Sequence, residues 1–195
     1  MVTIVAPIAG LLLGFVDFVW IKYVPFPLGG LGNSMAVWAV AAFLVTWRAR
    51  WSLRASAIGA VVMLVVAVPA YYIAAAMIQN DDLANAYAWS ALVWMGMGLV
   101  AGVIFGAAGH LARTPGRFQA VAAALPGAVL FAEAAVELRR VGHPSYGVAD
   151  PLAFAAVLVA LGLAVTLLVA RRRTQLLTLP LAALGFVLFE LAGFR

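Results

Sequence analysis

The chain alternates between long apolar runs and short connectors that carry most of its polar residues. The apolar runs lie at 4–21, 33–47, 55–78, 86–112, 118–138, 151–170 and 175–193. An α-helix needs about 20 predominantly apolar residues to cross the hydrocarbon core of a membrane. The pattern therefore predicts an all-α, polytopic transmembrane helix bundle of seven spans, or six if the short second run is re-entrant. We expect residues 1–195 to form a single transmembrane domain.

Composition strengthens this prediction and excludes several classes of protein. Of the 195 residues, 67% are hydrophobic and 10% are charged, whereas soluble domains are about half apolar and about a quarter charged. A soluble enzyme, a disordered chain and a secreted disulfide scaffold are therefore excluded. The chain has no cysteine, which also rules out a thiol nucleophile and a thiolate metal site.

The basic residues predict how the chain is oriented. The loops after the second, fourth and sixth runs hold no acid and eight arginines: Arg48, Arg50, Arg54, Arg113, Arg117, Arg171, Arg172 and Arg173. The other side holds all seven acids with Lys22, Arg139, Arg140 and Arg195. Because basic residues collect on the cytoplasmic side, we expect the N-terminus inside and the C-terminus outside, in the cell (cytoplasmic) membrane of a bacterium. The partner of this basic chain is then the lipid bilayer and not nucleic acid, which requires a contiguous basic face.

Four acids lie within or at the edge of apolar runs: Asp17, Glu133, Glu137 and Glu190. In the predicted orientation all four fall in the outer third of the membrane. An ionised side chain within a span costs at least about 2.5 kcal/mol and usually faces the bundle interior or a wet cavity. The alternative explanation is that these acids reach the membrane surface or pair with the neighbouring arginines.

Aromatic residues add to this candidate site. Trp20, Trp47, Trp51 and Trp89 fit an ordinary interfacial belt, whereas Trp38 and Trp94 lie deeper in their runs. The predicted ligand-binding residues are Asp17, Asn33, Trp38, Tyr71, Tyr72, Trp94, Glu133, Glu137 and Glu190.

Small residues recur four apart in the first run, at Ala6, Gly10 and Gly14. Such ridges let two helix backbones approach closely. Packing within the bundle is one interpretation, and docking of a membrane-protein partner is the other.

No cofactor and no metal site is expected. The only lysine, Lys22, lies in a predicted outer loop, so a retinal Schiff base in the last helix is excluded. His110 and His143 lie on opposite sides of the predicted membrane and cannot share a metal.

Several segments resemble those of a family of small actinobacterial multi-pass integral membrane proteins of unknown function. They are residues 33–43, residues 101–109 with Trp94 before them, the Tyr71–Tyr72 pair and residues 131–137. The resemblance implies a membrane protein and no particular activity.

The layout also resembles the substrate-binding S-components of energy-coupling-factor vitamin transporters. The shared features are the Pro- and Gly-rich connector at 25–33, the basic residues after a short second run, and the ridge at Ala6 and Gly10. This resemblance implies an outward-facing ligand site and a coupling partner that docks on the first helix. S-components have six spans, whereas seven are predicted here.

Three functions are compatible with these residues. The first is a membrane protein that binds or transports a small organic, cationic ligand in an outward-facing aromatic and acidic pocket. The second is an intramembrane enzyme in which Glu133 and Glu137 act as general acid and base on a lipid-soluble substrate. The third is a structural subunit of a membrane complex, with its acids paired to Arg139 and Arg140.

Overall fold

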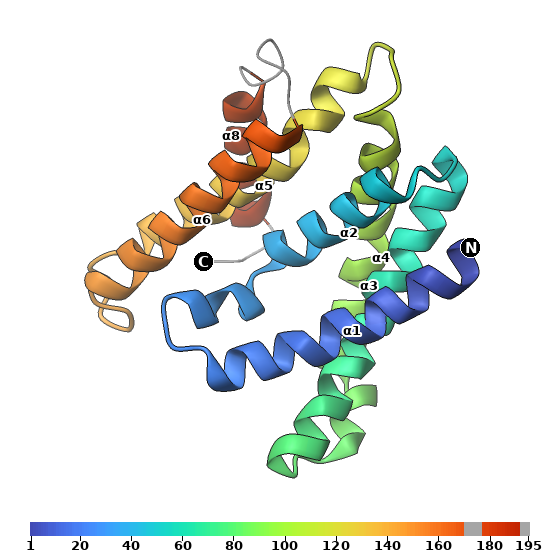
Figure 1. Cartoon of the computed structure of the whole chain (residues 1–195). Helices are drawn as coiled ribbons and strands as arrows, with labels where there is room; N and C mark the ends of the chain where they lie inside the picture. The colour runs from blue at the N-terminus through green and yellow to red at the C-terminus, as the bar shows by residue number, and fades with distance from the viewer. Residues whose placement is uncertain (170–176, 192–195) are drawn as a thin grey trace. The chain divides into compact units, whose positions relative to one another are not determined.

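The computed structural model describes residues 1–169 and 177–191, which form helices and no strand (Figure 1). The helices are α1 (Val2–Tyr23), α2 (Met35–Ala49), α3 (Leu53–Gln79), α4 (Trp89–Leu111), α5 (Gln119–Arg139), α6 (Ala149–Val169) and α8 (Thr178–Leu191). Two short 3₁₀ helices, η1 (Leu28–Asn33) and η2 (Leu83–Tyr87), lie in the connectors. Each predicted apolar run therefore contains a helix, and the all-α prediction is confirmed for the described residues. The predictions for Arg171, Arg172, Arg173 and Arg195 lie outside them.

Among the described residues, five helices are long and apolar enough to span a membrane: α1, α3, α4, α5 and α6. The other two apolar helices are shorter, with 15 residues in α2 and 14 in α8. Both fall below the length of about 20 residues that crosses the hydrocarbon core without thinning it. The structure thus has the helices of a membrane protein, while the number of spans and their orientation stay predictions.

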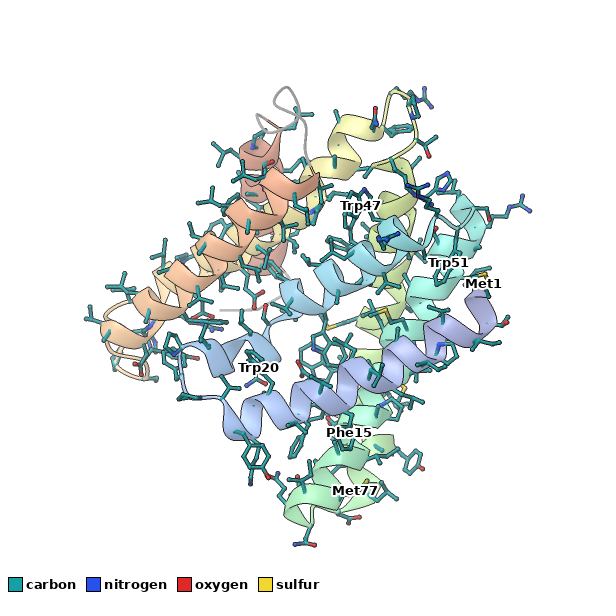
Figure 2. The ribbon with its side chains drawn as sticks, in the orientation of Figure 1. Met1, Phe15, Trp20, Trp47, Trp51 and Met77 are labelled. Carbon is teal, nitrogen blue, oxygen red and sulfur yellow. The ribbon has the colours of Figure 1, made fainter. Side chains whose placement is uncertain are left out.

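Large apolar side chains remain exposed along these helices. Leu12 is 59% exposed, Leu167 is 71% exposed and Leu188 is 57% exposed. Figure 2 labels two further examples, Phe15 in α1 and Met77 in α3. Soluble monomers rarely expose extended apolar surface, whereas lipid tails cover such side chains at no cost.

The chain divides into two compact units. Unit 1 contains Met1–Val24 and Trp38–His110, and unit 2 contains Pro25–Val37 and the described part of Leu111–Arg195. Helix α2 begins in unit 2 and continues in unit 1. The single domain expected from the sequence stays a prediction.

Helix α3 organises unit 1, because glycines on two other helices lie directly against it. A Cβ added to Gly14 of α1 would overlap the carbonyl oxygen of Ala67. On α4, a Cβ added to Gly102 would lie 2.6 Å from the backbone of Val61. The absence of side chains at these glycines lets α1 and α4 pack against the backbone of α3.

Unit 1 has two chemically different ends. The side chains of Val2 and Trp51 both approach Gly59, so the N-terminus and the arginine-bearing α2–α3 connector share one end, where Figure 2 labels Met1 and Trp51. At this end His110 Nδ1 also lies 2.8 Å from the carbonyl oxygen of Trp51. At the other end Lys22 Nζ donates a hydrogen bond of 3.1 Å to Gln79 Oε1.

Helix α5 organises unit 2, where it packs against α6 and α8 (Figure 1). Gly162 of α6 lies against the ring of Phe131, and a Cβ there would come within 2.8 Å of that ring. The connector before α2 also packs against α6, since the rings of Phe26 and Phe154 have centroids 6.2 Å apart. Unit 2 therefore holds the start of α2 beside the α5–α6 pair.

The glycine contact with α3 predicts a specific effect on stability. Gly14→Ala should lower the free energy of unfolding by about 2 kcal/mol, because the new methyl group must push α1 away from the α3 backbone. The measurement is the thermal unfolding midpoint, Tm, of the protein purified in detergent.

Gly96→Ala in α4 is the matched control. A Cβ at Gly96 meets nothing within 4 Å, so this change should leave Tm unchanged or raise it slightly through helix propensity. Equal Tm values for the two variants would contradict the packing of α1 on α3.

Candidate functional site

The nine predicted ligand-binding residues fall into one group in each unit. Unit 1 contains Asp17, Trp38, Tyr71, Tyr72 and Trp94, and unit 2 contains Asn33, Glu133, Glu137 and Glu190. We describe the two groups separately.

In unit 1, Asp17 is the centre of a small aromatic cluster. It lies in α1 and is 7% exposed. The indole N–H of Trp38, from α2, donates a hydrogen bond to its carboxyl group. Tyr71, from α3, is close enough to Asp17 for an electrostatic interaction. One carboxyl oxygen, Oδ2, is buried and has no hydrogen-bond partner among residues 1–169 and 177–191.

The helix packing explains why these residues meet. Gly14 lies three residues before Asp17, on nearly the same face of α1. A Cβ at Gly14 would come within 2.8 Å of the backbone nitrogen of Tyr71. The close approach therefore brings the next turn of α1 onto Tyr71, whose ring meets that of Phe18 edge-on at 5.3 Å. Tyr72 extends the cluster, with its ring centroid 5.5 Å from that of Tyr71.

This arrangement can bind a positive charge. A buried acceptor without a hydrogen bond costs about 1–3 kcal/mol, and more when it is charged. A proton or an ammonium group would satisfy Oδ2 directly. The faces of Trp and Tyr rings attract organic cations in addition.

Trp94 differs from the other aromatic residues of unit 1. It is 42% exposed, which is typical of a tryptophan that faces lipid or the membrane interface. We therefore leave Trp94 out of the Asp17 site.

In unit 2, Glu133 holds the start of α2. It is 8% exposed, and its Oε2 accepts hydrogen bonds from Ser34 Oγ at 2.7 Å and from the backbone N–H of Ala36 at 3.0 Å. Ser34 Oγ in turn accepts a hydrogen bond from the backbone N–H of Val37 at 3.1 Å. First-turn N–H groups have no partner within their own helix, so Glu133 and Ser34 together cap α2.

The other two candidate acids of unit 2, Glu137 and Glu190, form ion pairs. Glu137 accepts a hydrogen bond from Arg140 at 2.5 Å, and the Arg140 guanidinium also lies 5.1 Å from the ring centroid of Tyr146. Glu190 of α8 pairs with Arg139 of α5. These are the arginine partners that the third sequence hypothesis named.

The remaining predicted residues are Asn33 and the small residues of the α1 ridge. Asn33 is exposed at the end of η1. The ridge of Ala6, Gly10 and Gly14 is buried, and its two glycines lie against α3. A partner could reach this ridge only if α3 moved away, so the ridge serves packing within unit 1 and its docking role stays a prediction.

Ser34 is not among the predicted ligand-binding residues. It is the second residue of the predicted run 33–47 and directly precedes Met35, the first apolar residue of that run. A serine in this position is a usual signal for a helix N-cap. That signal was available, but its partner Glu133 lies 99 residues away along the chain and could not be inferred from it.

Comparison with known proteins identifies the family. The model of a family of unknown function, DUF6518, matches residues 1–194, and the chain belongs to that family. The resemblance to an uncharacterised membrane-protein family is thereby confirmed at the level of a family of unknown function. No curated protein and no solved structure matches the chain. An actinobacterial origin and the layout shared with S-components stay predictions.

The capping role of Glu133 predicts how its substitution changes stability. Glu133→Ala should lower the free energy of unfolding by about 1–3 kcal/mol, because it leaves the Ser34 hydroxyl and the Ala36 N–H without an acceptor. Glu133→Gln keeps one acceptor oxygen and should lower the free energy of unfolding by less than Glu133→Ala does. Tm of the purified proteins should therefore fall in the order wild type, Glu133→Gln, Glu133→Ala, which thermal unfolding measures.

Glu190→Gln is the control, because it also removes an acidic side chain of unit 2. The Arg139 side chain of that pair is 58% exposed, and exposed pairs contribute no more than about 1 kcal/mol. An equal or larger loss of Tm in Glu190→Gln than in Glu133→Ala would contradict the cap.

Proposed function

We propose that this member of DUF6518 is an integral membrane protein that binds a small organic cation at Asp17. Trp38, Tyr71 and Tyr72 would provide aromatic faces for the cation. The observation that carries the proposal is the buried Oδ2 atom of Asp17, which has no hydrogen-bond partner.

The surroundings of Asp17 favour a positively charged ligand. The carboxyl group lies in α1, a helix long and apolar enough to span a membrane, where a lone ionised carboxylate is expensive. The Trp38 N–H donates one hydrogen bond to the Asp17 carboxyl group. An ammonium group can supply both a donor for Oδ2 and a positive charge that compensates the carboxylate. A neutral apolar ligand would supply neither.

The charge pattern supports a cell-membrane location with the N-terminus inside. Arg50 lies in the α2–α3 connector, with Arg48 in the last turn of α2 and Arg54 in the first turn of α3. The connector after α3, at the other end of unit 1, carries Asp81 and Asp82. With the arginine-bearing end in the cytoplasm, Asp17 lies toward the outward end of α1. Uptake or export of the bound cation is then the simplest use of the site.

A structural subunit of a membrane complex is the second candidate. It is favoured by the engagement of the three candidate acids of unit 2, with Glu133 in a helix cap and Glu137 and Glu190 in ion pairs. The same contacts disfavour the enzyme hypothesis, since Glu133 and Glu137 each already bind another group of the protein.

Cation binding predicts a shift of Tm that depends on Asp17. Purified protein is heated with choline, tetramethylammonium or butylammonium chloride at constant ionic strength. We expect at least one of these cations to raise Tm by about 5 °C at saturation. The neutral analogue 3,3-dimethylbutan-1-ol should have no effect.

Four variants test whether the cation binds at Asp17. The shift should vanish in Asp17→Asn, shrink in Trp38→Phe, and persist in Glu133→Gln and in Trp94→Phe. Absence of any cation-specific shift would overturn the function, and an unchanged shift in Asp17→Asn would overturn the site.

The proposed orientation predicts which connectors face the outside of the cell. Because the chain has no cysteine, single cysteines can be introduced at the exposed positions Ser52 and Ser145. A membrane-impermeant maleimide added to intact cells should label Ser145→Cys and leave Ser52→Cys unlabelled until the cells are lysed. The reverse pattern, or labelling of both in intact cells, would contradict the orientation.

A further inference from the structure

In the described part of unit 2, two buried threonine hydroxyls have no hydrogen-bond partner among the residues that the structure describes. Thr166 of α6 is 7% exposed, and Thr178, the first residue of α8, is 1% exposed. The Oγ1 atoms of both are buried and unpartnered. Each such group costs free energy unless something satisfies it.

These hydroxyls differ from an ordinary buried threonine. Thr46 of α2 is also fully buried, but its Oγ1 donates hydrogen bonds to the carbonyl oxygens of Ala42 and Phe43 at 3.1 and 3.0 Å. That is how a threonine within a helix usually satisfies its hydroxyl. Thr166 also lies within a helix, yet its hydroxyl makes no such hydrogen bond to a carbonyl oxygen of the described residues.

The two side chains meet at one point of α5. A Cβ added to Gly127 would overlap Thr166 Oγ1 and would lie 3.2 Å from Thr178 Cγ2. The carbonyl oxygen of Gly162, one turn before Thr166 in α6, would lie 3.3 Å from the same position. The absence of a side chain at Gly127 therefore lets the Thr166 hydroxyl, the Gly162 carbonyl oxygen and the methyl group of Thr178 all approach the same point of α5.

The residue before Gly127 leaves a backbone carbonyl group of α5 without its usual helical donor. Pro126 lies within α5 and has no N–H, so the carbonyl group of Ala122, four residues earlier, lacks its usual helical donor. Ala122 is buried. Carbonyl groups released in this way serve as cation ligands in membrane proteins.

We propose that Thr166, Thr178 and the proline break of α5 form a site for a small monovalent cation, Na⁺. Hydroxyl and carbonyl oxygens are the hard, neutral ligands that such a cation takes. In the described part of the chain, no group of three or more acidic or histidine side chains is placed to hold a metal ion, which disfavours a divalent cation. The tight packing at Gly127 favours Na⁺ over the larger K⁺.

This site is separate from Asp17, since it lies entirely in unit 2. The sequence predicts no metal site, and neither threonine is among the predicted ligand-binding residues. Binding of Na⁺ here would give the protein an ion-dependent stability whether or not Asp17 binds an organic cation.

The experiment measures Tm of the full-length protein in detergent while NaCl replaces KCl or choline chloride at constant ionic strength. We expect Na⁺ to raise Tm of the wild type by about 5 °C with saturation, and K⁺ to have a much smaller effect. Binding of radioactive ²²Na⁺ to the same preparation should saturate over the same concentration range.

Substitutions test the ligands. Thr166→Val and Thr178→Val should each abolish the Na⁺-dependent shift and the ²²Na⁺ binding, whereas Thr166→Ser, which keeps the hydroxyl, should retain both. Thr46→Val is the control, because it removes a buried hydroxyl that is already satisfied, and it should keep the Na⁺ response.

Equal Tm in Na⁺, K⁺ and choline with no ²²Na⁺ binding would overturn the proposal and leave an internal water as the partner of the hydroxyls. If the valine variants do not fold, an unchanged Na⁺ response in Thr166→Ala and Thr178→Ala would overturn it equally.

Discussion

A polar group inside an apolar helical protein needs a partner from the protein or from a ligand, because lipid supplies none. The acids here meet this constraint in different ways. Glu133 accepts two hydrogen bonds at the start of α2, and Glu137 pairs with Arg140. Within the described part of the chain, Asp17 receives the Trp38 indole N–H, and its buried Oδ2 has no hydrogen-bond partner. That difference separates an acid that stabilises the fold from one available to a ligand.

The close packing of helix backbones determines where this constraint applies. Gly14 brings α1 against α3 in unit 1, and the next turn of α1 carries Asp17 to Tyr71. In unit 2, Gly127 brings α5 against the Thr166 hydroxyl and the Thr178 methyl group, and both threonine hydroxyls lack a hydrogen-bond partner among the described residues. In both places a glycine allows close contact between helices beside a polar group whose hydrogen bonding is incomplete within the described part of the chain.

The sequence predicted the seven apolar helices because length and hydropathy define them. It could not predict which residues share a site, because these helices are apolar on every face and their periodicity does not reveal the buried side. The predicted orientation placed the nine candidate residues toward the outer side of the membrane. A similar depth in the membrane does not show which of these side chains are in contact. Asp17 and Trp38 do meet, Trp94 is exposed, and Glu133 is a helix cap. The threonines near Gly127 gave no signal, since threonine within a helix normally satisfies itself.

An experimental density map of the wild-type protein in lipid nanodiscs, with the best-binding organic cation at saturation, tests the central claim most directly. The account predicts ligand density within hydrogen-bond distance of Asp17 Oδ2 and in contact with the rings of Trp38 and Tyr71. A map in which Oδ2 is hydrogen-bonded to another group of the protein, with no ligand density beside it, would contradict the account.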